Sequence, residues 1–230
     1  MSKIAATGIM RQKRKIRPTR RSVSGVYMFR GVTPIEFEST LERDFLIRKE
    51  FSLAVLDVIP QPCQIEYRDQ SGRARIYTPD FCVYYRLGNR SYKDYHKPLL
   101  VEVKPEKEWR KHWRDWLPKW KAARRYAQEI GAEFHIHDES RIRDQMFENI
   151  QFLSRYKRMS FPTEESSWVL RNLSEMGMAT VDYLLARHFP GIYRAEGIAH
   201  LWHLLATRKI DCDISRPLNM FTEVWVPTEV

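Results

Sequence analysis

Two apolar segments of this chain each end in charged residues, and this pairing constrains the fold more than any other feature. The segments are Tyr77–Phe81 (YTPDF) and Leu99–Pro105 (LLVEVKP). Because side chains two apart on a strand point to the same face of a sheet, Glu102 and Lys104 share a face. The strand around them is apolar, and charged groups in such surroundings need a partner or a chemical role. The pattern predicts two neighbouring strands that bring Asp80, Glu102 and Lys104 to one edge of a sheet.

The chemistry of these groups favours metal-dependent cleavage of a phosphodiester. Mg²⁺ takes oxygen ligands, commonly one or two carboxylates together with substrate phosphates, and a metal ion can activate water and stabilise transition-state charge. We expect Asp80, Glu102 and the Val103 carbonyl to bind Mg²⁺, with Mn²⁺ as a substitute. Lys104 is expected to orient the attacking water and to offset negative charge. A strand-end aspartate and a surface Glu-Lys pair would give the same short pattern, so the interpretation depends on its context.

A further carboxylate, Glu42, falls on the apolar face of a predicted helix. Thr33-Pro34-Ile35-Glu36 has the pattern of a capping box with proline at the first helical position, and predicts a helix that runs to about Phe51. Glu38 and Glu42 both lie within its apolar stripe. Either these glutamates reach solvent from the edge of the stripe, or Glu42 completes the metal site as a fourth catalytic residue.

The net charge of +10 is concentrated in two blocks. Residues 1–30 carry nine Lys or Arg and no acid, and residues 104–125 carry nine basic and three acidic side chains. Two such blocks on a nearly neutral body indicate a polyanionic partner, most simply double-stranded DNA. For the first block, a solvated tail is the alternative. The residues expected to contact DNA are Arg11, Lys13, Arg14, Lys15, Arg17, Arg20, Arg21, Arg110, Lys111 and Arg114.

The apolar pattern predicts a mixed α/β domain over 31–156, preceded by a flexible basic arm over 1–30. Strands are expected at 53–59, 65–67, 74–87, 98–103 and 132–137. Helices are expected at 106–130, where Pro118 should divide the segment into two, and at 139–156. Four tryptophans at helical spacing within 106–130 are expected to pack in the core, and the alternative is a binding surface that tracks a DNA backbone.

A second, winged-helix-like domain is predicted over 157–230. Its pattern is three helices, at 164–176, 180–188 and 193–207, followed by a hairpin of 209–212 and 221–226. Residues 158–230 hold seven basic and nine acidic side chains. We therefore expect this domain to bind a protein, or simply to cap the core, rather than to bind DNA.

The three cysteines favour a reducing compartment. Cys63, Cys82 and Cys212 lack C-x-x-C spacing, which argues against a disulfide framework or a zinc site. Neither a signal-peptide pattern nor an apolar segment of membrane-spanning length is evident. We expect a cytoplasmic protein without membrane contact, associated with the nucleoid while it works.

Five segments together resemble the TnsA family, the endonuclease subunits of heteromeric bacterial transposases. The catalytic domain of this family has the restriction-endonuclease-like PD-(D/E)xK fold, a mixed sheet flanked by helices. The resemblance covers about residues 33–155 and extends more loosely to the C-terminus. The segments are Ser39–Glu42, Val55–Val58, Gln61-Pro62, Tyr77–Phe81 and Glu102–Pro105.

The resemblance implies specific roles. Glu42, Asp80 and Lys104 match the family's helix glutamate, strand aspartate and lysine. The position of Glu102 varies between Glu and Gln in such enzymes, and Glu38 matches no catalytic position. The resemblance also implies cleavage of the 5′ strands at transposon ends during cut-and-paste transposition. A DDE transposase would then cut and join the 3′ ends, and an AAA+ regulator would bind the C-terminal domain.

Two alternatives stay open. The same fold suits a free-standing restriction, repair or junction-resolving nuclease, and a chain with a decayed site would be a non-catalytic DNA-binding scaffold. All four candidate catalytic residues are chemically competent, which disfavours decay.

Overall fold

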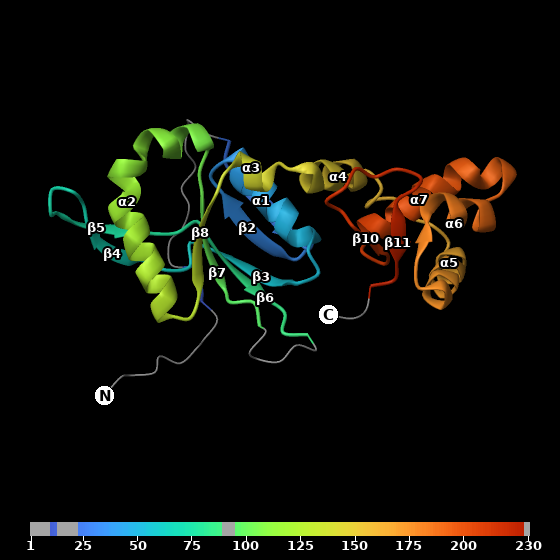
Figure 1. Ribbon diagram of the computed structural model, residues 1–230, viewed down its shortest axis with the longest axis horizontal. Coiled ribbons are helices and arrows are strands. Elements are labelled where there is room, and N and C mark those ends of the chain that lie inside the picture. Colours follow the sequence, from blue (N-terminus) through green and yellow to red (C-terminus); the bar gives the residue numbers. More distant parts are fainter. Residues whose placement is uncertain (1–9, 13–22, 89–94, 228–230) are drawn as a thin grey trace. The chain divides into compact units, whose positions relative to one another are not determined.

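A computed structural model describes residues 10–12, 23–88 and 95–227 of the chain. Its contacts divide the chain into two compact units, with the division between Ile142 and Arg143. Each unit is described by itself (Figure 1). Within these ranges, no helix has the length and apolarity that crossing a membrane requires.

The first unit is built around a four-stranded mixed sheet. Its strands lie in the order β3 (Val55–Pro60), β6 (Phe81–Tyr85), β7 (Leu99–Val103) and β8 (Glu133–His137). β6 is antiparallel to both β3 and β7, whereas β8 is parallel to β7. All five residues of β7 are buried, as expected for a central strand covered on both faces. The mixed sheet flanked by helices confirms the predicted fold class.

Alternate side chains of β7 enter two different cores. Leu99, Val101 and Val103 pack in one cluster with the apolar face of α1 (Thr40–Phe51). Leu100 packs in a second cluster with the alanines of α2 (Glu106–Glu129). Figure 1 shows α1 and α2 on opposite sides of the sheet. Because side chains alternate along a strand, residue 102 points to the α2 side together with residue 100.

The segment before α1 is a strand, so the predicted helix start was wrong. β2 (Thr33–Phe37) pairs antiparallel with β1 (Gly25–Phe29). Ile35 and Phe37 are buried and the residue between them is not, so a period of two prevails over the helical period. Pro34 is tolerated because a two-stranded ribbon consists only of edges. The flexible-arm prediction is likewise wrong for 25–29, which form β1.

α1 itself begins after Ser39, which caps the helix together with Glu42. Ser39 has an extended backbone, and its Oγ accepts a hydrogen bond from the Glu42 amide at 3.1 Å. This places the start of the helix about six residues later than predicted.

The predicted strand over 74–87 is interrupted. β4 (Ile65–Arg68) and β5 (Ala74–Tyr77) form a separate hairpin, whereas β6 joins the main sheet. Pro79 lies in the break, where it has no ladder hydrogen bond to donate. The Gln61 amide donates to the Asp80 carbonyl at 2.8 Å and anchors the break next to the end of β3.

α2 is one helix of 24 residues that contains Pro118, so the predicted division into two helices was wrong. Figure 1 shows the helix bending instead, which is the usual effect of an internal proline. Of its four tryptophans, Trp120 is buried, Trp109 and Trp116 are half-buried, and Trp113 is 43% exposed. The core prediction therefore holds only for Trp120.

The single helix predicted over 139–156 is instead two helices, α3 (Glu139–Ile142) and α4 (Gln145–Ser154). Asp144 separates them, because its carboxylate caps α4 by accepting from the Phe147 amide at 3.1 Å. By its contacts α4 belongs to the second unit, although the sequence suggested a boundary near residue 157. Its Asn149 side chain donates to the carbonyls of Ile214 and Arg216 at 2.9 and 2.7 Å.

The remainder of the second unit has the predicted three helices and hairpin. Gly197 allows close packing, because a Cβ there would lie 2.3 Å from the Phe189 ring. β9, a strand that was not predicted, adds to the hairpin and gives the sheet order β10-β11-β9. The elements are α5 (Thr163–Met176), β9 (Ala179–Thr180), α6 (Val181–His188), a 3-10 turn (Gly191–Tyr193), α7 (Arg194–Ala206), β10 (Asp211–Cys212) and β11 (Glu223–Trp225).

Candidate active site

Asp80 and Glu102 come from neighbouring strands whose register brings their ends together. Phe81 pairs with Val101, so the residue before β6 lies opposite the last residues of β7. The Val103 amide donates to Asp80 Oδ2 at 2.8 Å and fixes the carboxylate at this edge. The structure thus places Asp80 beside the Glu-x-Lys segment.

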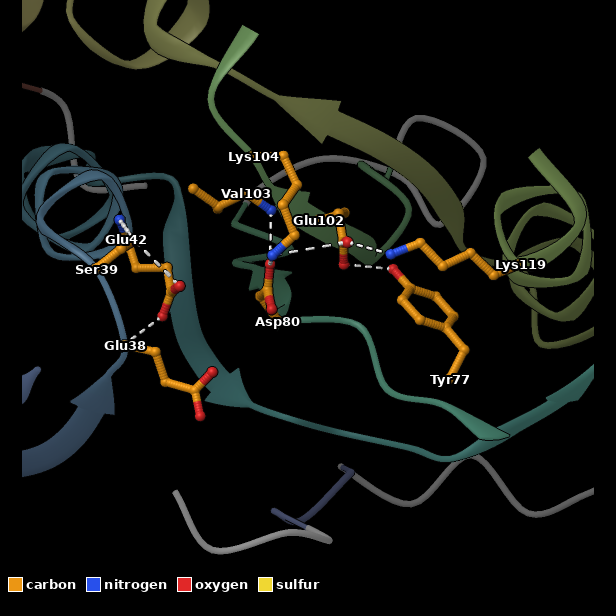
Figure 2. A network of polar contacts seen from close by, with 9 residues as sticks. All are labelled: Glu38, Ser39, Glu42, Tyr77, Asp80, Glu102, Val103, Lys104 and Lys119. Carbon is orange, nitrogen blue, oxygen red and sulfur yellow. Dashed lines mark hydrogen bonds and ion pairs between the residues drawn. The ribbon is translucent and has the colours of Figure 1, made fainter. Parts of the chain in front are cut away.

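Lys104 lies between the two carboxylates (Figure 2). Its Nζ is 3.7 Å from Asp80 Oδ2 and 3.8 Å from Glu102 Oε1. Burial alone lowers the pKa of Lys104, but the negative charges of Asp80, Glu102 and Glu42 outweigh burial and raise the pKa above its usual value. The side chain is therefore a permanent cation at neutral pH, suited to offsetting negative charge rather than to accepting a proton.

Burial and neighbouring negative charges disfavour the ionised form of Asp80. Burial raises its pKa well above the usual range, and the negative charges of Glu102 and Glu42 raise it further. Lys104 and the Val103 amide oppose this shift. An added cation at this edge would relieve the repulsion between the carboxylates.

Two residues that the sequence reasoning missed engage Glu102, whose side chain is almost fully buried. The Tyr77 hydroxyl donates to Glu102 Oε2 at 2.7 Å, and Lys119 Nζ donates to Oε1 at 2.9 Å (Figure 2). Tyr77 lies within the YTPDF motif, so a buried polar partner could have been sought there. No spacing in the sequence points to Lys119, because its contact with Glu102 depends on how α2 packs against the Leu100 side of β7.

Glu42 is engaged elsewhere. Its Oε2 accepts from the Glu38 amide at 2.8 Å, and its Oε1 accepts from Ser39 Oγ at 3.1 Å. Burial raises its pKa despite these hydrogen bonds. Figure 2 shows the Glu42 carboxylate at the N-terminus of α1, next to the Glu38 side chain. Glu42 therefore caps its own helix while contributing negative charge to Asp80 and Lys104.

The donor atoms at this edge are of the types that bind a hard cation such as Mg²⁺. Asp80 and Glu102 offer carboxylate oxygens, and Val103 offers a backbone carbonyl, which are the ligand types that Mg²⁺ prefers. In the part of the chain that the structure describes, no three His, Cys, Asp or Glu side chains are grouped to hold a metal ion. Glu42 is thus not brought into a common cluster with the other two carboxylates, although Mg²⁺ sites commonly use only one or two carboxylates.

The predicted DNA-contacting residues that can be placed are exposed. Arg110, Lys111 and Arg114 lie in the first half of α2, with Arg110 over the Trp109 ring at 5.3 Å and Arg114 over the Trp113 ring at 5.2 Å. Arg11 is exposed and follows Met10, whose amide donates to the Tyr84 hydroxyl at 3.1 Å. The remaining six lie outside the described residues: Lys13, Arg14, Lys15, Arg17, Arg20 and Arg21.

Comparison with known families matches both units. The model of the TnsA-like endonuclease N-terminal domain matches residues 52–139, which include Asp80, Glu102 and Lys104 but not Glu42. The model of the TnsA endonuclease C-terminal domain matches residues 141–214. No curated protein matches the chain. Since the two family models together cover most of the chain, in the order and at the boundary of its two units, this chain belongs to the family of TnsA-like endonucleases.

Proposed function

We propose that this nuclease is a metal-dependent DNA endonuclease that cuts the 5′ strands at transposon ends. The observation that carries the proposal is the meeting of Asp80, Glu102 and Lys104 at adjoining strand ends. These three residues lie within the segment that matches the N-terminal endonuclease domain. Phosphodiester hydrolysis requires charge stabilisation and a positioned water, and this edge supplies the groups for both.

Each residue has a chemical role in this proposal. Asp80, Glu102 and the Val103 carbonyl would hold Mg²⁺, and Mn²⁺ would substitute for it. When bound, the ion supplies Lewis-acid stabilisation of the developing charge on the phosphate. Lys104, held as a cation by its carboxylate neighbours, orients the attacking water and offsets the transition-state charge. Glu42 contributes negative charge from α1, and it would reach the metal, or a water on it, only by giving up its hydrogen bonds to Glu38 and Ser39.

The surface around the site favours DNA as the substrate. Arg110, Lys111 and Arg114 are exposed on α2, which also contributes Lys119 to the site. Exposed guanidinium and ammonium groups bind phosphates without reading sequence. The basic residues over 11–21 would extend this contact along the duplex.

Family membership supports the partner assignment. A DDE transposase would cut the 3′ strands, and an AAA+ regulator would bind the second unit. The slight acidic excess of residues 158–230 favours a protein partner over DNA for this unit. The assembly would act in the bacterial cytoplasm, on the nucleoid.

A strand-resolved cleavage assay tests the proposal. Transposon-end DNA is incubated in Mg²⁺ with the protein, with and without the neighbouring transposase. Wild type is compared with Lys104→Ala and with Lys107→Ala, which removes an exposed lysine of α2. We expect Lys104→Ala to lose the 5′ cuts alone, while 3′ cuts persist and Lys107→Ala behaves as wild type.

The other outcomes distinguish the alternatives. Cutting by wild type without its partner would indicate a free-standing nuclease. Identical cuts by wild type and Lys104→Ala would contradict the assigned site and favour the DNA-binding scaffold.

A further inference from the structure

Lys119 places a second ammonium group in the candidate site, in closer contact with Glu102 than Lys104 is. Its Nζ lies 2.9 Å from Glu102 Oε1, whereas Lys104 Nζ lies 3.8 Å from the same oxygen. The Lys119 side chain is 15% exposed, and that of Lys104 is 26% exposed. Lys119 is therefore the direct ion-pair partner of this buried carboxylate.

Both carboxylate oxygens of Glu102 already have partners in this arrangement. Oε1 is shared by two ammonium groups, and Oε2 accepts the Tyr77 hydroxyl at 2.7 Å. The two carboxylates, Asp80 and Glu102, are matched in number by the two lysines. A divalent ion bound by Glu102 would face the positive charges of both lysines, and like charges oppose each other strongly where water is scarce.

The ammonium of Lys119 also lies against three aromatic rings. The Nζ lies 4.7 Å from the centroid of the Trp116 ring, 5.0 Å from that of Tyr77 and 5.8 Å from that of Trp120. Aromatic faces attract a cation at these distances. The rings therefore contact the ammonium at the same position as Glu102 Oε1, and these contacts do not depend on Glu102.

We propose that Lys119 is a positioning residue that competes with the divalent metal ion for Glu102 and so sets the metal affinity of the site. The inference rests on the metal site of the proposed function. Lys119 neutralises Glu102 and holds its carboxylate against Tyr77. A metal ion bound by Glu102 would have to break this ion pair, and the cost would weaken metal affinity when DNA is absent.

Calorimetric titration of the full-length protein with Mn²⁺ in the absence of DNA tests this competition. Lys119→Met removes the charge and keeps the aliphatic stem, and Lys119→Gln removes the charge but keeps an N–H donor for Glu102. A unit charge within about 4–6 Å shifts a pKa by roughly 1–3 units, that is, it changes the affinity of a site for a proton at least about tenfold. The same charge acts on the affinity of the site for a metal ion. We therefore expect both variants to bind Mn²⁺ at least about tenfold more tightly than wild type. Lys121→Met removes an exposed lysine of the same helix and should change the affinity by less than about twofold.

The readout separates competition from a merely structural role. If Lys119 only supported the fold, its loss would weaken Mn²⁺ binding or leave it unchanged, and either result in Lys119→Gln would overturn the inference. Thermal unfolding with and without Mn²⁺ provides a second readout. Tighter binding to the folded state should give both variants a larger rise in Tm with Mn²⁺ than wild type. Binding to none of the proteins would refute the metal site itself, whereas equal binding to all would refute only the competition by Lys119.

Discussion

Replacement of Tyr77 by phenylalanine removes one oxygen from the hydrogen-bond network around Glu102. The hydroxyl donates to Glu102 Oε2 at 2.7 Å, and both side chains are buried. Phenylalanine fills the same space apart from the hydroxyl, so loss of packing adds little. The substitution therefore isolates the contribution of a single hydrogen bond to a buried carboxylate.

The expected magnitude follows from the burial of this pair. A hydrogen bond to a charged group contributes about 1.5–3 kcal/mol, and a buried acceptor left without its donor costs its full desolvation penalty. We expect Tyr77→Phe to lower the free energy of unfolding by about 2–3 kcal/mol. For a chain of this size, that corresponds to a fall in Tm of roughly 4–12 °C.

Urea denaturation followed by tryptophan fluorescence measures the effect, with Tyr67→Phe as the matched control. Tyr67 lies on β4, next to the strand that carries Tyr77, and packs against the same core cluster. No hydrogen bond to its hydroxyl is seen among the described residues, so the control should cost less than about 0.5 kcal/mol. Equal losses in the two variants would contradict the expectation, because the Tyr77 hydroxyl would then contribute nothing through Glu102.

Three further perturbations address other parts of the molecule. Glu42→Gln keeps an oxygen for the α1 cap, so the free energy of unfolding should fall by less than about 1 kcal/mol. The cleavage rate should fall at least about tenfold, and a variant that kept both its stability and its cleavage rate would show that Glu42 is only a helix cap. Burial lowers the pKa of His200 to about 4, whereas a histidine in the unfolded chain has a pKa of about 6.5. Between about pH 6.5 and about pH 4 this histidine therefore binds a proton only in the unfolded chain, so the free energy of unfolding falls as the pH drops across this interval. His200→Gln should remove up to about 3 kcal/mol of that fall, and parallel pH profiles of unfolding free energy would contradict the assignment. Replacing the seven basic residues over 11–21 by glutamine should flatten the plot of log K for DNA binding against log salt concentration. The slope should change by about 0.9 for each phosphate that the segment neutralises, and an unchanged slope would make the segment a solvated tail.

The sequence predicted best those features that depend on a single strand and its end. The apolar run of β7 specifies a central strand, and the alternation along it places Glu102 and Lys104 on one face. Because Asp80 precedes the neighbouring strand, the approach of the three charged groups followed from local pattern alone. The change in pattern along the chain predicted a boundary near residue 157, whereas the contacts divide the chain after Ile142.

Features that depend on tertiary packing were harder to predict from the sequence. Thr33-Pro34 suits either a helix start or an edge strand, and pairing with β1 decides in favour of the strand. Lys119 reaches Glu102 because α2 covers the Leu100 side of the sheet, and the rotation of a helix over a sheet leaves no mark in residue spacing. The role of Glu42 as a helix cap was hidden because its partner, Ser39, was placed inside the predicted helix.

The proposed activity requires that Asp80 is part of a catalytic centre and not a structural carboxylate at a strand end. Single-turnover cleavage of transposon-end DNA, measured together with DNA affinity, decides between these two roles. Asp80→Asn keeps an oxygen for the Val103 amide, and Asp69→Asn makes the same change in the β4–β5 turn. We predict a loss of at least about 100-fold in the cleavage rate for Asp80→Asn, with DNA affinity unchanged and Asp69→Asn close to wild type. Cleavage by Asp80→Asn at the wild-type rate would contradict the catalytic role of Asp80.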